Sequence, residues 1–319
     1  MKGCSMKQIW NLSLAMLVLL AGALASPTLT AAQDSTQAGV PVQMVVTLQP
    51  RKGSTMPDVS REDVMVHQGR DRRKTLDWVP LQGDHAGLEL FLLIDDSSNF
   101  SLGSKLDEIK QFIQAQPAST KVGIAYMQNG TARVAQDLTD DHALAGKALR
   151  LPLGVGGANA SPYFALQDLI KRWPERNERR EVVMITNGAD RLWGNKPADT
   201  YVDIALDEAQ KAGILVYSIY TPSQGRGARG FGRMNWGQNY LSQMADGTGA
   251  QSYYLGNGAP VSFVPYLDDL AGRLKRQYLL TFQAKPEKKA GLQSVKVTTE
   301  VPNASLESAK QVFVPAMPQ

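Results

Sequence analysis

The chain has 319 residues, of which 43% are hydrophobic and 20% are charged, with 28 Gly and 17 Pro. This composition is that of a globular protein and excludes a disordered, collagen-like or polytopic membrane chain, while the length allows one large domain and a smaller one. The formal net charge of +4 gives little support to nucleic-acid binding, which needs clustered excess positive charge, so we expect no nucleic-acid partner.

Residues 1–25 are predicted to be a secretory signal peptide. Lys2 and Lys7 precede an apolar stretch from Ile9 to Ala25, and small residues follow it, which is the order typical of such signals. Cleavage is expected after this stretch, with Ala32 as a second candidate site. The alternative is an uncleaved membrane anchor. Against it, Asn11, Ser13 and Gly22 interrupt the stretch, and its length is at the lower limit of the roughly 17 to 25 residues needed to span a bilayer.

Export is the expected consequence, to the periplasm or the extracellular space, and no integral membrane span remains once the signal is cleaved. Cys4, the single cysteine of the chain, leaves with the signal. The mature protein is therefore expected to contain no disulfide and no thiolate metal site.

Residues 26–38 predict a flexible leader, and residues 39–84 predict an N-terminal β segment. Between Val40 and Leu48 apolar side chains occupy alternate positions, as expected of a half-buried strand. A second stretch, Asp63 to His67, is followed by a polar turn and by an extended segment that contains Trp78.

From residue 85 to residue 277 the pattern changes to strands that alternate with amphipathic helices. Asn129-Gly130 predicts a tight hairpin turn, since both residues readily adopt positive φ angles. Expected strands are Leu88–Ile94, Val122–Met127, Ala132–Leu138, Val182–Thr186, Ile214–Tyr220 and Ser252–Leu255; expected helices cover Leu106–Ile113, Phe164–Ile170, Val202–Ala209, Tyr240–Met244 and Val264–Leu274. This alternation predicts an α/β fold, an open and mostly parallel sheet with helices on both faces.

Residues 278–319 predict a C-terminal β segment. Its expected strands are Tyr278–Gln283, Ser294–Val301 and Gln311–Val314, separated by polar turns at 285–290 and 303–310. They lie too far beyond the last helix to extend its sheet simply. We therefore expect them to pair with the N-terminal segment in a small β-sandwich made from both ends of the chain.

Polar loops follow the carboxyl ends of the expected strands, where open parallel sheets bind ligands. The first loop contains Asp95, Ser97 and Asn99, the second runs from Gly154 to Ser161, and the third is Thr186-Asn187-Gly188. A carboxylate with alternate hydroxyl and amide oxygens on a tight turn suits a hard cation such as Mg²⁺.

These loops resemble those of the von Willebrand factor type A (vWA) domain, and the chain is similar to the bacterial exported VWFA-related subfamily over roughly residues 40–315. Such domains carry a metal-ion-dependent adhesion site with Asp-x-Ser-x-Ser on the first loop, Thr on the second and Asp, within Thr-Asp-Gly, on the third. Asp95 and Ser97 match this pattern. Asn99 and Asn187 replace a Ser and the Asp, and Ser161 is the hydroxyl nearest the expected Thr.

The resemblance implies a vWA or Rossmann-like fold with a degenerate metal site formed by Asp95, Ser97, Asn99, Ser161 and Asn187. Two interpretations stay open. The site binds Mg²⁺ weakly, or Asp95 and Ser97 only tie the loops together.

The function we expect is non-enzymatic, namely protein–protein interaction or adhesion with envelope or extracellular partners. The surface implied is made by the loops at 95–104, 154–162, 187–198 and 222–237. An alternative is an enzyme that uses the same cleft with a nucleotide or metal cofactor, since Gly225 to Gly230 has the dinucleotide-binding spacing. That spacing follows a late strand, however, and residues 231–236 are expected to delay the helix that the motif requires. A further alternative is a structural module with an idle metal site.

Overall fold

Strand β5 (Leu88–Asp95) lies inside a six-stranded sheet and is buried along its whole length. Its side chains alternate between two cores: Leu90 and Leu92 face one, and Phe91 and Leu93 face the other. A strand covered on both faces reads as a continuous apolar run, which is the pattern that predicted it.

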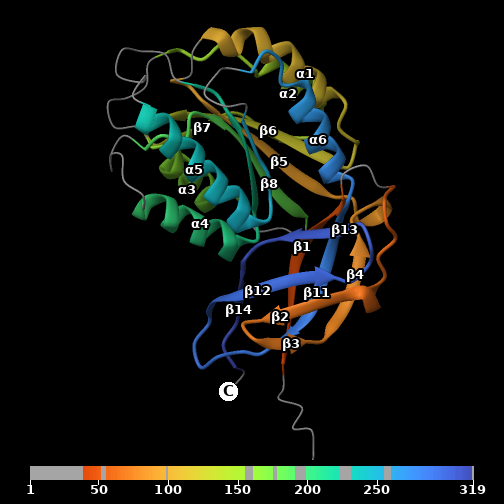
Figure 1. The fold of residues 1–319 in the computed structure, drawn as a ribbon. Helices are drawn as coiled ribbons and strands as arrows, with labels where there is room; N and C mark the ends of the chain where they lie inside the picture. Colours follow the sequence, from red (N-terminus) through yellow and green to blue (C-terminus); the bar gives the residue numbers. More distant parts are fainter. Residues whose placement is uncertain are drawn as a thin grey trace, which may run out of the picture. The chain divides into compact units, whose positions relative to one another are not determined.

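The computed structural model describes residues 39–51, 55–97, 100–154, 161–174, 178–190, 199–222, 231–254 and 260–317 (Figure 1). Within these ranges, no helix is both long enough and apolar enough to cross a bilayer.

The central sheet has the order β10-β9-β8-β5-β6-β7, and every pairing in it is parallel except that of β7 with β6. Counted from β5, this is the order 3-2-1-4-5-6 of a doubly wound fold, in which the connections reverse direction between the first and fourth strands. The predicted α/β class is thus confirmed. The strands beside β5 are β6 (Thr120–Gln128), β7 (Thr131–Thr139), β8 (Arg179–Thr186), β9 (Leu215–Tyr220) and β10 (Ser252–Tyr253).

Helices cover both faces of this sheet (Figure 1). One face carries α1 (Leu106–Gln114), α2 (His142–Lys147) and α6 (Val264–Leu274); the other carries α3 (Pro162–Arg172), α4 (Thr200–Ala212) and α5 (Phe231–Thr248). Short 3₁₀ helices occur at η1 (Arg61–Asp63), η2 (Gly83–His85) and η3 (Phe100–Lys105). The hairpin turn is as predicted, with φ of 49° at Asn129 and 73° at Gly130.

Helix α5 corrects the sequence-based expectation. It spans 18 residues, whereas the pattern predicted a short helix at Tyr240–Met244. Its first turns include Gly232, Asn235 and Gly237, which are poor helix formers, so local propensity argues against a helix there. Packing against the sheet and against the loop after β8 overrides that propensity.

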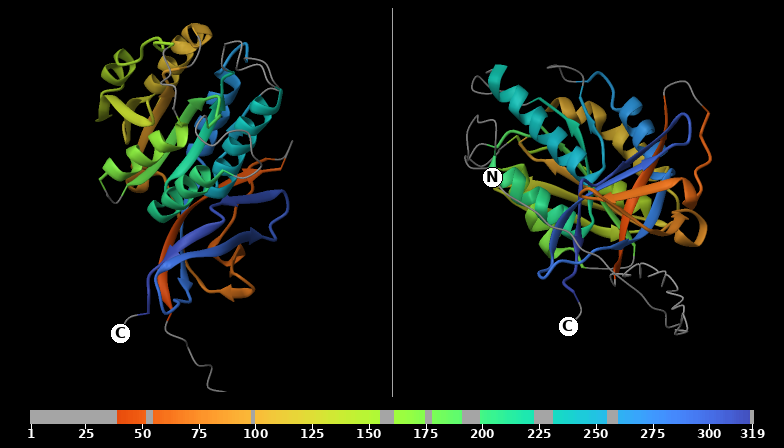
Figure 2. Two further views of the ribbon diagram at one scale, coloured as in Figure 1. Left: turned by 90° about the vertical axis from the view of Figure 1, so that its left-hand side faces the viewer. Right: turned by 60° about the horizontal axis from the view of Figure 1, so that its bottom comes forward.

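The two ends of the chain form two further four-stranded sheets that share one core (Figure 2). Val42 on β1 lies opposite Phe282 on β11, in antiparallel register. One sheet has the order β13-β1-β11-β4, with β1 (Val40–Pro50), β4 (Thr75–Pro80), β11 (Gln277–Ala284) and β13 (Ala304–Ser308). The other has the order β14-β12-β2-β3, with β2 (Val64–Gln68), β3 (Asp71–Arg73), β12 (Gly291–Thr299) and β14 (Gln311–Val314).

Strand β13 was not predicted, because residues 303–310 read as a polar turn. It extends the first sheet by pairing with β1, where Leu306 lies opposite Leu48. The strand contains Ser305, Glu307 and Ser308, so its composition carries little β signal. Its pairing partner lies more than 250 residues away in the sequence, beyond the reach of local pattern analysis.

Candidate functional site

Asp95, the last residue of β5, ties the first loop to the third. One of its carboxylate oxygens accepts hydrogen bonds from the Ser97 backbone N–H at 2.9 Å and from the Ser97 hydroxyl at 2.6 Å. The other accepts from the Thr186 hydroxyl at 2.8 Å. Asp95 is buried, with 7% of its surface exposed. Sequence analysis missed Thr186 as a partner, although it ends β8, the strand paired with β5.

The three loops meet at one small hollow. Asp95, Ser97, Ser161 and Asn187 all line it, together with Met127 and Gly130 of the β6–β7 hairpin. The hollow has a volume of about 10 Å³, which is the space that a single water molecule needs. Asn99, the fifth predicted ligand, lies outside the described residues.

Ser161 occupies the N-cap position of α3, but its hydroxyl forms no hydrogen bond with the helix amides. It donates instead to a carboxylate oxygen of Asp190 at 2.7 Å. Asp190 is 5% exposed and was not predicted. Asp190 follows Asn187 in the third loop. An acidic residue that closely follows a buried strand is the sequence signal that could have identified it.

The third loop is fixed by a close approach to α5. The Asn187 side-chain oxygen accepts from the Ala189 N–H at 2.8 Å, which closes a local turn. Gly188 has φ of 68°, and a Cβ added there would overlap the carbonyl oxygen of Gly237 on α5. Glycine is therefore required at Gly188 by both its backbone angle and its neighbour.

Tyr163 on α3 also holds this loop, because its hydroxyl donates to the Gly188 carbonyl at 2.9 Å. Burial, and then the nearby carboxylates of Asp199 and Asp190, raise the pKa of Tyr163 well above its ordinary value. The hydroxyl consequently stays protonated and remains a donor.

The residues around the hollow fit a divalent cation in part. Hydroxyl, amide and carboxylate oxygens converge there, which is the ligand chemistry that Mg²⁺ takes. Asp95 is the one carboxylate among the described residues that line it. Across the described part of the chain, no three His, Cys, Asp or Glu side chains form a group suited to a metal ion. The donor set thus supplies one negative charge, with neutral oxygens as the remaining donors.

Asp96, the residue after Asp95, does not line this hollow and has its own set of partners. Arg150 donates to both of its carboxylate oxygens, at 2.6 and 2.9 Å, and the Leu153 N–H donates at 2.9 Å. Gln128 adds a bond of 2.5 Å. Burial alone would raise the pKa of Asp96, but these hydrogen bonds outweigh it and hold the pKa below its ordinary value.

Asp96 thereby anchors the segment 150–154 at the carboxyl edge of the sheet. The Gly154 N–H donates to the Asp96 carbonyl at 3.0 Å. The Arg150 guanidinium also lies 3.8 Å from the ring centre of Tyr126, a cation–π contact. The anchored segment leaves Leu151 49% exposed and Leu153 56% exposed.

The glycine-rich run at 225–230 lies outside the described residues. One reason for doubting a dinucleotide site there was wrong, since α5 begins at Phe231 without the expected delay. The other reason stands, because the run follows β9 and not the first strand of the fold.

No family model and no curated protein matches the chain. Many solved structures are similar to it, and three of them are described here. An aerotolerance-related membrane protein from Bacteroides fragilis has 16% identity and a TM-score of 0.39, covering 59% of this chain and 98% of its own. The SpRpn10 VWA domain has 12% identity and a TM-score of 0.37, covering 57% and 94%. The vWF domain of the type V pili tip protein Mfa5 from Porphyromonas gingivalis has 10% identity and a TM-score of 0.39, covering 58% and 94%.

These likenesses concern the fold alone, and the α/β assignment rests on the strand order and pairing described above. Two of the three are VWA or vWF domains. The α/β part of this chain is a doubly wound open sheet with helices on both faces.

Proposed function

We propose that the chain is an exported, non-enzymatic binding protein that takes a protein partner at the carboxyl edge of its central sheet. The observation that carries the proposal is the convergence of three loops beyond β5 and β8, at the point where the strand order reverses. Doubly wound sheets bind their ligands at that point.

The size of the hollow favours surface contact over a substrate cleft. Pockets for small molecules have volumes of roughly 300–1,000 Å³, whereas the hollow beside Asp95 has about 10 Å³. The anchored segment beside it offers Leu151 and Leu153 instead. The anchored segment exposes these two apolar side chains to solvent. Exposed apolar side chains of this kind are suited to the buried centre of a protein–protein contact.

A weakly held Mg²⁺ is the second element of the proposal. Asp95, Ser97, Ser161 and Asn187 would hold it, and an open coordination position would accept a carboxylate from the partner. Because Asn187 stands where a vWA site has Asp, the site has one negative charge fewer, and we expect millimolar rather than micromolar affinity.

The partner surface can be tested with the chain from Ser26 onward, immobilised and exposed to cell-envelope extract. A protein that binds the wild type should be lost with Leu151→Ser/Leu153→Ser and retained with Ile204→Ser. Ile204 is the matched control, because it is 42% exposed on α4. Equal capture by all three forms would contradict the proposal, and so would turnover of a nucleotide or other substrate.

Titration calorimetry with Mg²⁺ and with Mn²⁺ tests the metal. Heat in the wild type that disappears in Asp95→Ala supports a bound ion. Absence of heat in the wild type would leave the three loops as a purely protein-binding surface. Export is tested separately, by N-terminal sequencing of the mature protein, which we expect to begin at Ser26.

A further inference from the structure

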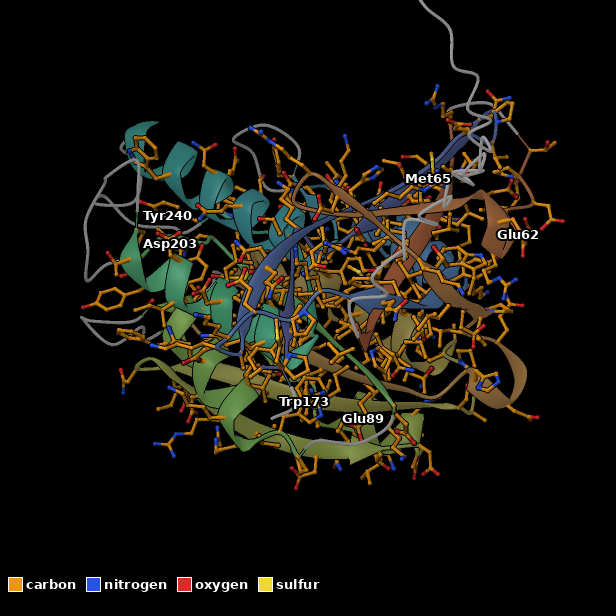
Figure 3. All side chains as sticks on the ribbon, turned by 90° about the horizontal axis from the view of Figure 1, so that it is seen from below. Glu62, Met65, Glu89, Trp173, Asp203 and Tyr240 are labelled. Carbon is orange, nitrogen blue, oxygen red and sulfur yellow. The ribbon has the colours of Figure 1, made fainter. Side chains whose placement is uncertain are left out.

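The β2–β3 hairpin carries an unusual concentration of positive charge. Arg70, Arg72, Arg73 and Lys74 fall within five positions. Arg72, Arg73 and Lys74 line a groove of about 520 Å³ together with Arg61. Val64 and Leu76 also line this groove. Glu62 is the one acidic residue among the described residues that line it, and Figure 3 labels it on this part of the molecule.

Two of these cations are paired within the protein. Arg61 forms a salt bridge with Glu62 at 2.7 Å, and Arg73 forms one with Asp71 at 2.7 Å. The hydrogen bond from Arg61 lowers the pKa of Glu62, so this acid is ionised at neutral pH. The other three, Arg70, Arg72 and Lys74, are exposed, and none has a carboxylate within salt-bridge distance in the described part of the chain. The groove therefore keeps an uncompensated positive charge.

The charge continues across the outer face of the sheet. Lys296 on β12 lies opposite His67 on β2, and His67 lies opposite Arg72 on β3. Successive strands are about 5 Å apart. Lys296 and Arg72, which lie on either side of His67, are therefore about 10 Å apart. A charged edge strand protects against aggregation, which explains Arg72 on β3. It does not explain Lys296, because β12 is an inner strand.

The described chain begins at the same end of the β-sandwich. Pro41 lies opposite Gln283 on β11, and on the other side of β11 the Gln283 N–H donates to the Lys74 carbonyl at 2.9 Å. The start of β1 and Lys74 are therefore about two strand spacings apart, or about 10 Å. The 13 residues 26–38 separate this part of the chain from Ala25, the last residue of the apolar stretch that we predict to be a signal. A segment suited to a bilayer therefore precedes the basic end of the β-sandwich in the sequence.

We propose that the basic cluster formed by Arg61, Arg70, Arg72, Lys74 and Lys296 docks on anionic phospholipid headgroups. Guanidinium and ammonium groups donate to the phosphate oxygens, and the adjoining groove receives a headgroup. The surface lies in the β-sandwich, so this inference is independent of the function proposed for the carboxyl edge of the central sheet.

Vesicle co-sedimentation tests it. The chain from Ser26 onward contains all three cores and lacks the apolar stretch, which would bind any bilayer. It should sediment with vesicles of phosphatidylcholine and phosphatidylglycerol, in a salt-dependent manner, and not with phosphatidylcholine alone. Arg72→Gln/Lys74→Gln should lower the partition coefficient about 25-fold, because each basic residue near an anionic surface contributes about fivefold. Arg72→Glu/Lys74→Glu should lower it further.

The matched control makes the same charge changes at exposed residues of the α/β part, Lys110 on α1 and Arg133 on β7. Lys110→Gln/Arg133→Gln should bind as the wild type does. The urea unfolding midpoint of each variant shows whether it is folded, so that a loss of binding is not confused with unfolding. In Arg72→Glu/Lys74→Glu the edge strand β3 still carries a charge that opposes aggregation. Loss of vesicle binding by this variant is therefore not explained by aggregation.

Three results would overturn the proposal. The first is equal sedimentation of the wild type and both cluster variants. The second is release from the vesicles by millimolar inorganic phosphate at constant ionic strength, which would indicate a site for a free anion. The third is capture of polyglutamate without binding to vesicles, which would indicate an acidic protein partner.

Discussion

The indole N–H of Trp173 donates to a carboxylate oxygen of Glu89 at 2.7 Å, inside the α/β core (Figure 3). Glu89 lies on β5 and is fully buried, and Trp173 follows α3 and is 5% exposed. A buried carboxylate is costly unless it is hydrogen-bonded. This contact therefore links the end of α3 to the amino-terminal end of β5.

Trp173→Phe should therefore lower the free energy of unfolding by about 2–3 kcal/mol, from the lost donor and the smaller ring. Urea denaturation measures it. In the double-mutant cycle with Glu89→Gln, the two changes should be non-additive by at least about 0.5 kcal/mol. Simple additivity would show that the hydrogen bond contributes little.

Glu181 predicts a pH dependence of stability. Burial raises its pKa from 4.5 to about 7, against the opposing charge of Arg179, and Gln277 and Tyr217 lie in the same buried group. The folded state thus binds a proton that the unfolded state has lost between pH 4.5 and 7. The contribution of Glu181 to the free energy of unfolding is therefore fully present below pH 4.5. It falls by up to about 3 kcal/mol as the pH rises to 7.

Glu181→Gln should flatten that part of the profile and stabilise the protein above pH 7. Urea unfolding of both forms at several pH values from 4.5 to 8 is the measurement. Parallel profiles for the two forms would rule Glu181 out as the titrating group.

Asp96 should be essential for the anchored segment 150–154. Asp96→Ala leaves the Arg150 guanidinium and the Leu153 N–H without their acceptor. We expect a loss of about 2–3 kcal/mol in the free energy of unfolding, less than for a fully buried pair because Arg150 is partly exposed. Limited proteolysis should show earlier cleavage near Leu151. Arg150→Lys is the milder comparison, since it keeps the charge and loses the two-point contact.

Gly188→Ala tests the contact between the third loop and α5. Ala at a positive φ costs about 1–2 kcal/mol by itself, and the overlap with Gly237 adds to it. Gly69→Ala is the matched control, because Gly69 has φ of 60° and no atom within 4 Å of the added Cβ. A thermal unfolding shift that is clearly larger for Gly188→Ala supports the contact. Equal shifts in the two variants would show that Gly188→Ala destabilises the protein only through its positive φ angle.

The sequence predicts well where one local pattern determines the outcome. The run from Leu88 to Ile94 required a strand buried on both faces, and Asn129-Gly130 required a hairpin; both occur. The meeting of Asp95 and Asn187 at one hollow followed from topology, because the parallel strands β5 and β8 end at one edge of the sheet.

Contacts that depend on the tertiary arrangement were not predicted. The choice of Asp190 by the Ser161 hydroxyl depends on how α3 and the third loop pack, and no spacing encodes it. The full length of α5 is opposed by the helix propensity of its first residues, and its close approach to Gly188 joins it to a loop distant in sequence. The ligand set that includes Asn99 stays a prediction.

The pairing of β1 with β11 constrains the order in which the protein folds. Val42 lies opposite Phe282, 240 residues further along the chain. Synthesis proceeds from the N-terminus, so β1 emerges long before its partners β11 and β13 are available. The intervening α/β domain, whose helices and neighbouring strands are close in sequence, can assemble while β1 waits. The β-sandwich closes last, when the C-terminal strands arrive, and until then β1 is an unpaired strand open to chaperones and to aggregation.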